Sequence, residues 1–476
     1  MPADSQPGAS PLAVHRLDWM PDPERAFVHL YGESRNAFWL DSSAGGERGR
    51  FSFMGDSQGP HGALVTYDVE LGEVRVERNG GVEVRAESIF DYLGRELERL
   101  RPLATDLPFD LNCGFAGYLG YELKAECDGA VAHQATTPDV AIVFADRLIA
   151  FDHQKQHAYL LSLTEADPWI EETERRLAGL PALAEPRVVT TPPLLPRRSR
   201  QRYRADIEVC KRYLTAGHSY EICLTNALEA KTDADPLELY RALRRVNPAP
   251  FAAYLRFGDL AVLSSSPERF LSVDRDGNAE ARPIKGTSRR GVTAAEDARL
   301  AAELRSGAKS RAENVTIVDL MRNDLGRVCE LGSVEVPELM RIESFETVHQ
   351  LVSSVRGRLR PELTPIDAVH ACFPPGSMTG APKRRTMEII DELEGAARGV
   401  YSGAIGWFGL GGACDLSVAI RTIVLDGERV SVGAGGAIVV DSDPGEELAE
   451  MLLKARASTA AFKCEKSHLG RTLASS

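Results

Sequence analysis

The stretch AAYLRFGDLAVLSSSPERFLSV, residues 252–273, decides the fold class predicted for this chain. It holds three strand-like runs in succession, at Ala252–Arg256, Leu260–Ser264 and Arg269–Val273, separated by short turns. Strands joined this closely pair as antiparallel hairpins, because a parallel crossover needs about a dozen residues or more. The sequence therefore predicts an α+β fold with antiparallel sheets and not a doubly wound parallel sheet.

Helical patterns lie on both sides of these strands. We predict helices at Ile89–Leu100, Gln201–Thr215, residues 294–325 and Gly445–Ala460. No internal repeat is apparent.

A proline-rich stretch, Thr191–Pro196, is the predicted boundary along the chain. It separates an N-terminal region, residues 1–190, from a second region, residues 197–465. The basic run at residues 197–204 that follows is interpreted as a linker entering a solvated helix, and a nucleic-acid patch is the weaker alternative.

Composition excludes several classes of protein. The 476 residues carry a net charge of −13, which argues against wholesale nucleic-acid binding. The eight cysteines contain no Cys-x-x-Cys pair, as expected in a reducing compartment. No window approaches the ~18 apolar residues of a membrane span, and Met1–His15 has no apolar signal core. We therefore expect a cytoplasmic protein without nucleic-acid or membrane partners.

The segment Arg282-Pro-Ile-Lys-Gly-Thr287 places one lysine between a proline and a glycine. The amine of Lys285 is a candidate covalent nucleophile if its surroundings keep it neutral. Gly286 would allow a substrate to approach the backbone, and Thr287 would add a positioning hydroxyl. The alternative is an exposed hairpin lysine, which is the more common state of this residue type.

Acidic side chains at helical spacing form a second group. Glu313 shares a stripe with Ile317 and Leu320, and a buried acid requires a partner or a metal. The alternative is a glutamate at the helix edge that reaches solvent.

Near the C-terminus, Glu447, Glu450 and Lys454 are spaced i, i+3 and i+7 and share one helix face. They form either a surface stripe with a Glu450–Lys454 ion pair, or two carboxylates for Mg²⁺ and a lysine for a substrate anion.

These motifs together resemble the chorismate-utilising enzymes, and within them the aminodeoxychorismate synthase component I branch, which is related to anthranilate synthase component I. The matching stretches follow the family order across residues 205–460 and are Ser265–Phe270, Arg282–Thr287, Arg311–Asn314, Val318–Leu325, Val348–Ser353, Gly376–Lys383, Tyr401–Gly406, Ala419–Thr422 and Gly433–Gly435. A weaker resemblance covers the first 190 residues. The family fold implied is a sandwich of two packed antiparallel β-sheets with helices on the outside.

The resemblance implies chorismate as substrate and Mg²⁺ as metal. Glu313 and Glu450 would bind the metal, with Glu447 acting through metal-bound water. Some relatives carry another acid where this chain has Ser310. The metal would hold the ring carboxylate, and Lys454 would add positive charge nearby.

The resemblance also assigns the second carboxylate of chorismate. Tyr401, Arg421 and the backbone at Gly435 would hold the enolpyruvyl carboxylate. An arginine fork suits a carboxylate because two parallel hydrogen bonds fix its orientation.

Three positions distinguish members of the family. Lysine at 285 marks aminodeoxychorismate synthases, whereas anthranilate synthases usually carry alanine there. Isochorismate and salicylate synthases carry a lysine where this chain has Glu221, so water addition is disfavoured. His349 is shared with anthranilate synthases; its role is either substrate contact or structural.

The chemistry implied for Lys285 is attack on C2 as the C4 hydroxyl leaves, followed by attack of ammonia on C4. Glu268 is the candidate general acid for the hydroxyl, and it could first deprotonate Lys285. The alternative for Glu268 is a structural pairing with an arginine.

Ammonia requires a source. The chain contains no Gly-x-Cys-x-Gly nucleophile turn, so the resemblance implies a separate glutamine amidotransferase subunit. The expected product is 4-amino-4-deoxychorismate, in 4-aminobenzoate and folate biosynthesis.

Two alternatives remain. One is anthranilate synthase component I. The other is a catalytically silent subunit that binds chorismate or tryptophan, since Trp39–Ser43 and Asn247–Phe251 resemble the feedback region of tryptophan-sensitive relatives.

Overall fold

The structure is a computed structural model that describes residues 12–42, 49–187, 189–345 and 348–464. Two large sheets form its centre, each with twelve strands within these ranges. Every pairing in both sheets is antiparallel. The predicted α+β sandwich is confirmed.

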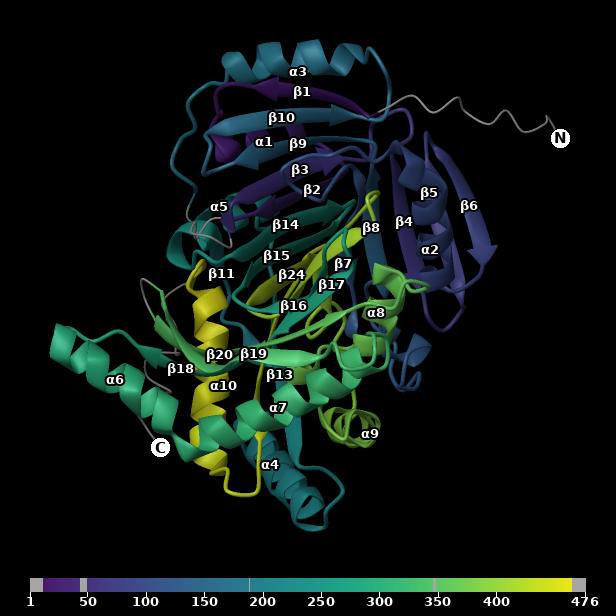
Figure 1. The fold of residues 1–476 in the computed structure, drawn as a ribbon. Coiled ribbons are helices and arrows are strands. Elements are labelled where there is room, and N and C mark those ends of the chain that lie inside the picture. The colour runs from purple at the N-terminus through teal and green to yellow at the C-terminus, as the bar shows by residue number, and fades with distance from the viewer. Residues whose placement is uncertain (1–11, 43–48, 188, 346–347, 465–476) are drawn as a thin grey trace.

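The first sheet stacks from top to bottom in Figure 1. Its order is β1 (Ala13–Leu17), β10 (His157–Ser162), β9 (Arg147–Asp152), β3 (Phe51–Asp56), β2 (Asn36–Asp41), β14 (Phe251–Phe257), β15 (Leu260–Ser266), β24 (Thr422–Asp426), β25 (Arg429–Ile438), β13 (Glu221–Lys231) and β12 (Leu195–Pro196), with β21 (Gly380–Ala381) also pairing with β13. β13 therefore has partners along both of its edges.

The second sheet begins at β18, the strand that carries Lys285. Its order is β18 (Ile284–Arg289), β20 (Val348–Arg358), β17 (Asn278–Arg282), β16 (Arg269–Val273), β23 (Ala413–Val418), β22 (Ala404–Gly409), β7 (Gly114–Leu119), β8 (Val140–Ala145), β4 (Ala63–Asp68), β5 (Glu73–Arg78) and β6 (Gly81–Ala86), with β19 (Glu335–Ser344) also pairing with β20. A short parallel pair joins β11 (Thr190–Thr191) to β26 (Lys463–Cys464).

Helices surround the sandwich (Figure 1). They are α1 (Pro23–Tyr31), α2 (Ile89–Leu100), α3 (Pro168–Ala178), α4 (Arg200–Thr215), α5 (Pro236–Val246), α6 (Ala294–Ser306), α7 (Ala308–Gly326), α8 (Pro365–Cys372), α9 (Lys383–Glu394) and α10 (Pro444–Thr459). None of the helices in the described ranges is long and apolar enough to cross a membrane.

The alternating side chains of β14 and β15 explain how the first sheet packs against the second sheet on one face and against the helices on the other. Leu255 and Val262 lie in the core between the two sheets, whereas Tyr254 and Leu263 lie in the core between the first sheet and its outer helices. Successive side chains of a strand point to opposite faces, so each strand serves both cores. Full burial of each large apolar side chain stabilises the fold by about 1.5–3 kcal/mol.

Both sheets take strands from both sides of the predicted boundary at residues 191–196. β2, for example, pairs with β14, and β7 pairs with β22. The division into residues 1–190 and 197–465 is therefore a division of the sequence and not of the sandwich.

The predicted elements agree closely with the structure. The helix at Ile89–Leu100 and the strand at Arg269–Val273 have the bounds predicted for them. Residues 294–325 form two helices instead of one, because Gly307 ends α6 in an extended conformation and precedes α7. This break brings the first turn of α7 toward the site described below.

Candidate functional site

Lys285 lies inside the molecule and not on an exposed hairpin. The residue is 8% exposed and stands on β18, beside a register shift between Ile284 and Thr287. Gly286 has φ +93°, a conformation that favours glycine, and a Cβ there would fall 3.0 Å from the hydroxyl of Ser310. The backbone next to Lys285 therefore packs tightly against the start of α7.

The ammonium of Lys285 contacts one carboxylate directly. Its Nζ donates to Oε1 of Glu221 at 2.6 Å, and Glu221 is 1% exposed. Burial lowers the pKa of Lys285, but the negative charges of Glu221 and then Glu313 outweigh burial, so the pKa lies above its ordinary value. In this state the lysine is a protonated partner of an ion pair.

Glu268 lies in the turn between β15 and β16 and is also buried. Burial raises the pKa of its carboxyl group to about 7, although the positive charge of Lys285 acts in the opposite direction. A carboxyl group with such a pKa is partly protonated near neutral pH and can act as a general acid. The arginine next in sequence, Arg269, pairs with Asp415 and Glu280, and the described residues include no Glu268–arginine ion pair.

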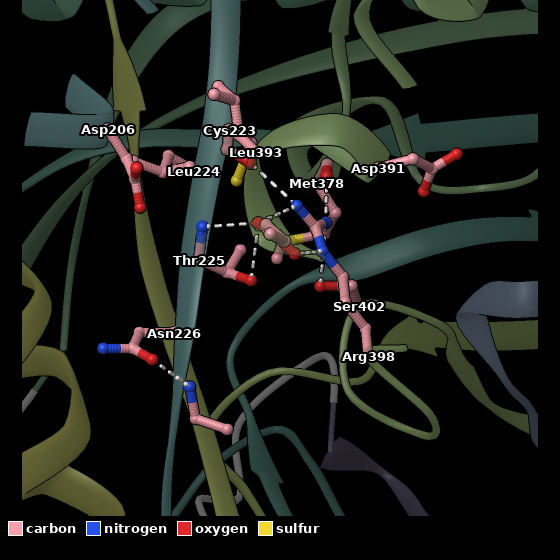
Figure 2. A network of polar contacts seen from close by, with 12 residues as sticks. Asp206, Cys223, Leu224, Thr225, Asn226, Met378, Asp391, Leu393, Arg398 and Ser402 are labelled. Atoms are coloured by element: carbon pink, nitrogen blue, oxygen red, sulfur yellow. Dashed lines mark hydrogen bonds and ion pairs between the residues drawn. The ribbon is translucent and has the colours of Figure 1, made fainter. Parts of the chain in front are cut away.

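A network around Arg398 fixes β13, the strand that carries Glu221 (Figure 2). The Arg398 guanidinium donates to both carboxylate oxygens of Glu394 and to the carbonyls of Cys223 and Met378. Glu394 accepts in turn from the backbone N–H and the hydroxyl of Thr225. Because these charges are buried and satisfied, removing one partner would cost about 3–5 kcal/mol.

This network borders a cavity of about 520 Å³, whose lining includes Thr225, Glu394, Arg398, Tyr401 and Gly433. The ring of Tyr401 packs directly against Gly433, since a Cβ on Gly433 would fall 2.1 Å from a ring carbon of Tyr401. A glycine at 433 is thus required to leave space for the aromatic ring.

The acidic residues of α7 and α10 meet around Lys309, in the first turn of α7. Its ammonium forms an ion pair with Glu447 and lies 3.8 Å from Glu313. The negative charge of Glu450 also contributes to the raised pKa of Lys309. The three carboxylates predicted as metal ligands therefore surround one ammonium group.

Glu313 is 8% exposed and shares its buried stripe with Ile317 and Leu320, as predicted. Burial raises the pKa of Glu313 to about 7, because the positive charges of Lys285 and Lys309 only partly compensate for it. An acid in this setting favours a cationic partner.

Local capping fixes where α10 begins and which residues face the site. The side chain of Asp443 accepts from the N–H groups of Gly445 and Glu446, and Pro444 occupies the first turn. Glu447 follows in the first turn, buried and hydrogen-bonded to the hydroxyl of Ser442 at 2.6 Å.

Further along α10, Lys454 pairs with Glu450 at 2.7 Å and donates to the carbonyl of Gly435 at 3.1 Å. The predicted i,i+4 ion pair is thus present. It lies at the edge of the site, since Glu450 is exposed and Lys454 is partly so. Gly435 itself faces Thr225 of β13 across the strand pair.

The carboxylates of Glu313, Glu447 and Glu450 have the donor chemistry of a metal site but are not arranged as one. In the described ranges no group of three or more His, Cys, Asp or Glu side chains is arranged around a common metal position. However, Oε2 of Glu447 is buried without a hydrogen-bond partner, and it lies 3.3 Å from where a Cβ on Gly436 would stand. Glu313, Glu447 and Glu450 supply the oxygen donors that Mg²⁺ prefers. The donor set has the chemistry of a hard-cation site, and in this structure the cation that it holds is the Lys309 ammonium.

Arg421 lies at a strained position, with φ +52°, between β23 and β24. Burial lowers the pKa of its guanidinium, and Tyr401 and Glu450 are the groups whose charges oppose this effect. Within the described residues no carboxylate forms an ion pair with Arg421. A partly buried arginine without a carboxylate partner is suited to receive the carboxylate of a ligand.

Thr287 stands on β18 two residues after Lys285, and His349 stands on β20 opposite Ser288. His349 is buried, and its two ring nitrogens contact Asp297 at 2.9 Å and the hydroxyl of Ser344 at 2.7 Å. With both nitrogens occupied, the structure favours the structural alternative for His349. The side chain of Thr287 is exposed beyond the register shift of β18.

A second cavity, of about 410 Å³, lies in the region that resembles a feedback site. It is lined by residues from β2, from the segment before β14 and from β22, including Asp41, Ser42, Pro250, Phe251 and Trp407. The two sequence stretches singled out for this role therefore meet at one cavity; Ser43 lies outside the described residues.

Sequence reasoning missed two contributors. No local sequence pattern indicated that Lys309 belongs to the site, because its ion pair with Glu447 joins two different helices. Arg398 follows a loop of small residues and looks like an ordinary surface arginine, although both it and Glu394 are buried. The spacing i, i+4 of Glu394 and Arg398 was the one available clue.

A family model described as chorismate binding enzyme matches residues 43–460. The chain belongs to the chorismate-binding enzymes.

Among its relatives is an aminodeoxychorismate synthase from Streptomyces pristinaespiralis, 48% identical over 489 aligned residues that cover 99% of this chain and 68% of that protein. A chloroplastic aminodeoxychorismate synthase from Arabidopsis thaliana is 43% identical and covers 90% of this chain and 51% of its own length. This chain thus spans between half and about two thirds of the length of these relatives.

Among solved structures, anthranilate synthase component I from Streptococcus pneumoniae superposes with a TM-score of 0.73 at 31% identity. The match covers 86% of this chain and 92% of that one. The shared fold therefore extends through both sheets.

Proposed function

We propose that this chain is the chorismate-converting part of an aminodeoxychorismate synthase, which makes 4-amino-4-deoxychorismate from chorismate and ammonia. The observation that carries the proposal is the buried Lys285, held at 2.6 Å from Glu221 among acidic groups. A lysine at this position, in a chain whose relatives include aminodeoxychorismate synthases, favours this activity over anthranilate synthesis.

Chorismate carries two carboxylates, and the site offers two places for them. Arg421 lacks a carboxylate partner among the described residues and lies near Tyr401, so these two side chains would hold the enolpyruvyl carboxylate. The other end of the site, between α7 and α10, would hold the ring carboxylate. Lys454 lies between the two places, bound to Gly435 and Glu450.

Mg²⁺ is the proposed cofactor, held by Glu313 and Glu450 with support from Glu447. When bound, it would neutralise the ring carboxylate and orient it. The protein's own part is to position these three acids from two helices, and to supply Lys309 as a cation that must leave them.

The proposed chemistry uses Lys285 as the nucleophile. Its neutral amine attacks C2 of chorismate, the two conjugated ring double bonds shift, and the C4–O bond breaks as Glu268 donates a proton to the leaving hydroxyl. Ammonia then attacks C4, and the Lys285 amine leaves C2. The raised pKa of Glu268, about 7, keeps a protonated fraction available for the first step.

Ammonia is proposed to come from glutamine through a glutamine amidotransferase partner. The chain contains no Gly-x-Cys-x-Gly nucleophile turn. With ammonium salt present, the protein should act without this partner.

A product assay tests the proposal. Purified protein with chorismate, Mg²⁺ and ammonium salt should form 4-amino-4-deoxychorismate and release no pyruvate. Formation of anthranilate with pyruvate would establish the anthranilate synthase alternative instead. Binding of chorismate without turnover would indicate a silent subunit.

We also propose tryptophan as a ligand of the 410 Å³ cavity. Its lining combines the aromatic side chains Phe53, Phe109 and Trp407 with polar Asp41 and Ser42, as an amphipathic amino acid would require. Calorimetric titration with tryptophan should show binding that the substitution Ser42→Trp, which fills the cavity, removes. Equal binding by both proteins would reject this assignment.

A further inference from the structure

The Lys285 amine must lose a proton before it can attack, and two carboxyl groups could accept that proton. Glu268 was one candidate from the sequence. In the structure, however, the direct hydrogen bond from Lys285 goes to Glu221, whereas Glu268 acts on Lys285 only through its charge. The distance of 2.6 Å lies within the reach required of a general base.

We propose that Glu221 is a further catalytic residue, the base that accepts the proton of Lys285 before the amine attacks C2 of the substrate. This inference rests on the proposed function, since it requires Lys285 to be the nucleophile. It assigns the two carboxyl groups separate tasks. Glu221 serves the incoming amine, and Glu268 serves the departing hydroxyl.

The environment of Glu221 suits this task. Its Oε2 is buried and has no hydrogen-bond partner among the described groups. Most buried carboxylate oxygens accept hydrogen bonds, so an unpartnered one is an exception that needs a physical reason. Uptake of a proton by Glu221 in each catalytic cycle is such a reason, because no hydrogen-bond donor has to leave Oε2 when the carboxylate becomes protonated.

Glu221 is also held rigidly. It stands at the start of β13, where it pairs with Ala381 of β21, and the next residue, Ile222, pairs with both Gly380 and Ile438. The residue after Ile222 is Cys223, and its carbonyl accepts a hydrogen bond from Arg398. A base on a strand with partners along both edges keeps its geometry better than one on a loop.

The step balances in atoms and charge. Glu221 takes one proton from the Lys285 ammonium, and the free electron pair forms the N–C2 bond. The C4–O bond breaks, and the hydroxyl leaves as water with a proton from Glu268. When ammonia bonds to C4, the N–C2 bond breaks and its electron pair returns to Lys285, which recovers the proton from Glu221. The ammonium group formed at C4 gives one proton back to Glu268.

The Lys285–Glu221 pair should determine how the rate of adduct formation depends on pH. Transfer within the Lys285–Glu221 pair changes no total number of protons, so the reactive form is a constant fraction of the pair between pH 6 and 9. In Glu221→Gln, the proton must go to bulk water. The rate of adduct formation should then rise tenfold per pH unit, up to the pKa that Lys285 has in the variant.

Other titratable groups interact with Lys285 through their charge. They are Glu268 from the β15–β16 turn, Glu313 from α7, Glu450 from α10 and Cys223 from β13, and the charge of Lys454 on α10 acts on three of them, Cys223, Glu268 and Glu450. All of them are unchanged in the variant. The ratio of the variant rate to the wild-type rate therefore cancels every contribution that does not depend on Glu221, whose charge also raises the pKa of Glu313.

The experiment measures formation of the Lys285–chorismate adduct by rapid acid quench and intact mass spectrometry, with Mg²⁺ and without ammonia, from pH 6 to 9. At pH 7 Glu221→Gln should be about 100-fold slower than wild type, within the range for loss of a general base. The rate ratio should rise about tenfold per pH unit. Glu221→Asp should react more slowly than wild type but keep a pH-independent ratio.

Asp324→Asn is the matched control. Asp324 pairs with another buried lysine at the same distance, with Lys383 Nζ at 2.6 Å, yet it lies outside the site. Its rate ratio to wild type should not change with pH.

A pH-independent ratio near one for Glu221→Gln would overturn the inference while leaving Lys285 as the nucleophile. Absence of any adduct in the wild-type protein would instead overturn the proposed function, and the inference with it. If Glu221→Gln does not fold, a rate ratio for Glu221→Asp that rises with pH would overturn the assignment.

Discussion

Two of the three buried lysines among the described residues, Lys285 and Lys383, differ in how fully their ammonium groups are satisfied. Lys383 donates to Asp324 at 2.6 Å and also to the carbonyls of Cys372 and Pro374. Lys285 donates to Glu221 at the same distance, and among the described residues it has no second acceptor. An ammonium group has three donors, so one lysine is saturated and the other is not.

The difference separates a structural ion pair from a reactive one. Lys383 ties α9 to α7 and to the loop before η4 (Gly376–Met378), where every donor of the ammonium is used. Around Lys285, by contrast, Glu221 Oε2 and Glu447 Oε2 lack partners and Arg421 lacks a carboxylate within the described ranges. Sites that must bind and transform a ligand commonly retain such unsatisfied groups at a cost in stability.

Lys285→Ala should have the largest effect, because it removes the reactive member of the comparison. We expect formation of 4-amino-4-deoxychorismate to fall by about a thousandfold, within the range for loss of a positioned catalytic group. Product analysis by chromatography measures this. Removal of the side chain opens space for ammonia at C2, so any C2-amino product is quantified separately. Unchanged formation of the C4-amino product would contradict the role of Lys285.

Lys383→Met should instead reduce stability. The substitution leaves Asp324 buried without its cation, which should lower the free energy of unfolding by about 3 kcal/mol. Urea denaturation measures the loss. The folded fraction should still form the Lys285 adduct at the wild-type rate, and a slower adduct in fully folded protein would show that the two lysines are not independent.

The stability of the site should depend on pH through Glu268. Folding raises the pKa of its carboxyl group from an ordinary value near 4.5 to about 7, so folding favours the protonated form. The stabilisation is then complete below about pH 4.5 and is lost as pH rises through 7, up to about 3 kcal/mol. Urea denaturation of wild type and Glu268→Gln at pH 5 and pH 8 tests this sign.

Glutamine mimics the protonated acid at both values of pH. The wild type should therefore lose stability relative to Glu268→Gln on going from pH 5 to pH 8. A relative gain over the same range would contradict the raised pKa.

Arg421→Gln tests whether the unpaired cation serves the substrate. Chorismate binding should weaken about 10- to 100-fold, since a hydrogen bond to a charged group contributes about 1.5–3 kcal/mol. The free energy of unfolding should not fall, because no partner of the protein's own is lost. Calorimetry measures the affinity for chorismate, and urea denaturation measures the free energy of unfolding. Unchanged affinity with reduced stability would make Arg421 a structural residue.

The smallest effect is expected for Lys309→Ala. Removing the ammonium from between Glu313 and Glu447 should increase the affinity for Mg²⁺ several-fold, because the metal no longer competes with it. Binding of Mn²⁺ as a spectroscopic probe, displaced by Mg²⁺, measures this without any turnover. Weaker metal binding in Lys309→Ala would show that the carboxylates are not the metal site.

The sequence predicted the layers of the fold because its patterns are local. The strand at Arg269–Val273 and the helix at Ile89–Leu100 have clear periods and clear ends, and both were predicted with the bounds observed. The break at Gly307 was missed, because the apolar pattern continues on both sides of it and one glycine does not determine a helix end.

The site was less predictable because its contacts join distant segments. Lys285 and Glu221 are 64 residues apart, and no local pattern indicates that they form a pair. The buried setting of Glu313 was visible from its apolar stripe, whereas the ion pair between Lys309 and Glu447 depends on how α7 meets α10. His349 was left open from the sequence, since only the fold shows that Asp297 and Ser344 occupy its ring nitrogens.

The central claim is that Lys285, and not the equally buried Lys383, becomes covalently attached to the substrate. The most direct test mixes the protein with chorismate and Mg²⁺ without ammonia, quenches it in acid, and locates the added mass by peptide fragmentation. We predict an increase equal to chorismate minus water on Lys285 in the wild type and in Lys383→Met, and none in Lys285→Ala. An adduct that persists in Lys285→Ala, or full-rate turnover with Lys285 unmodified throughout, would contradict the account.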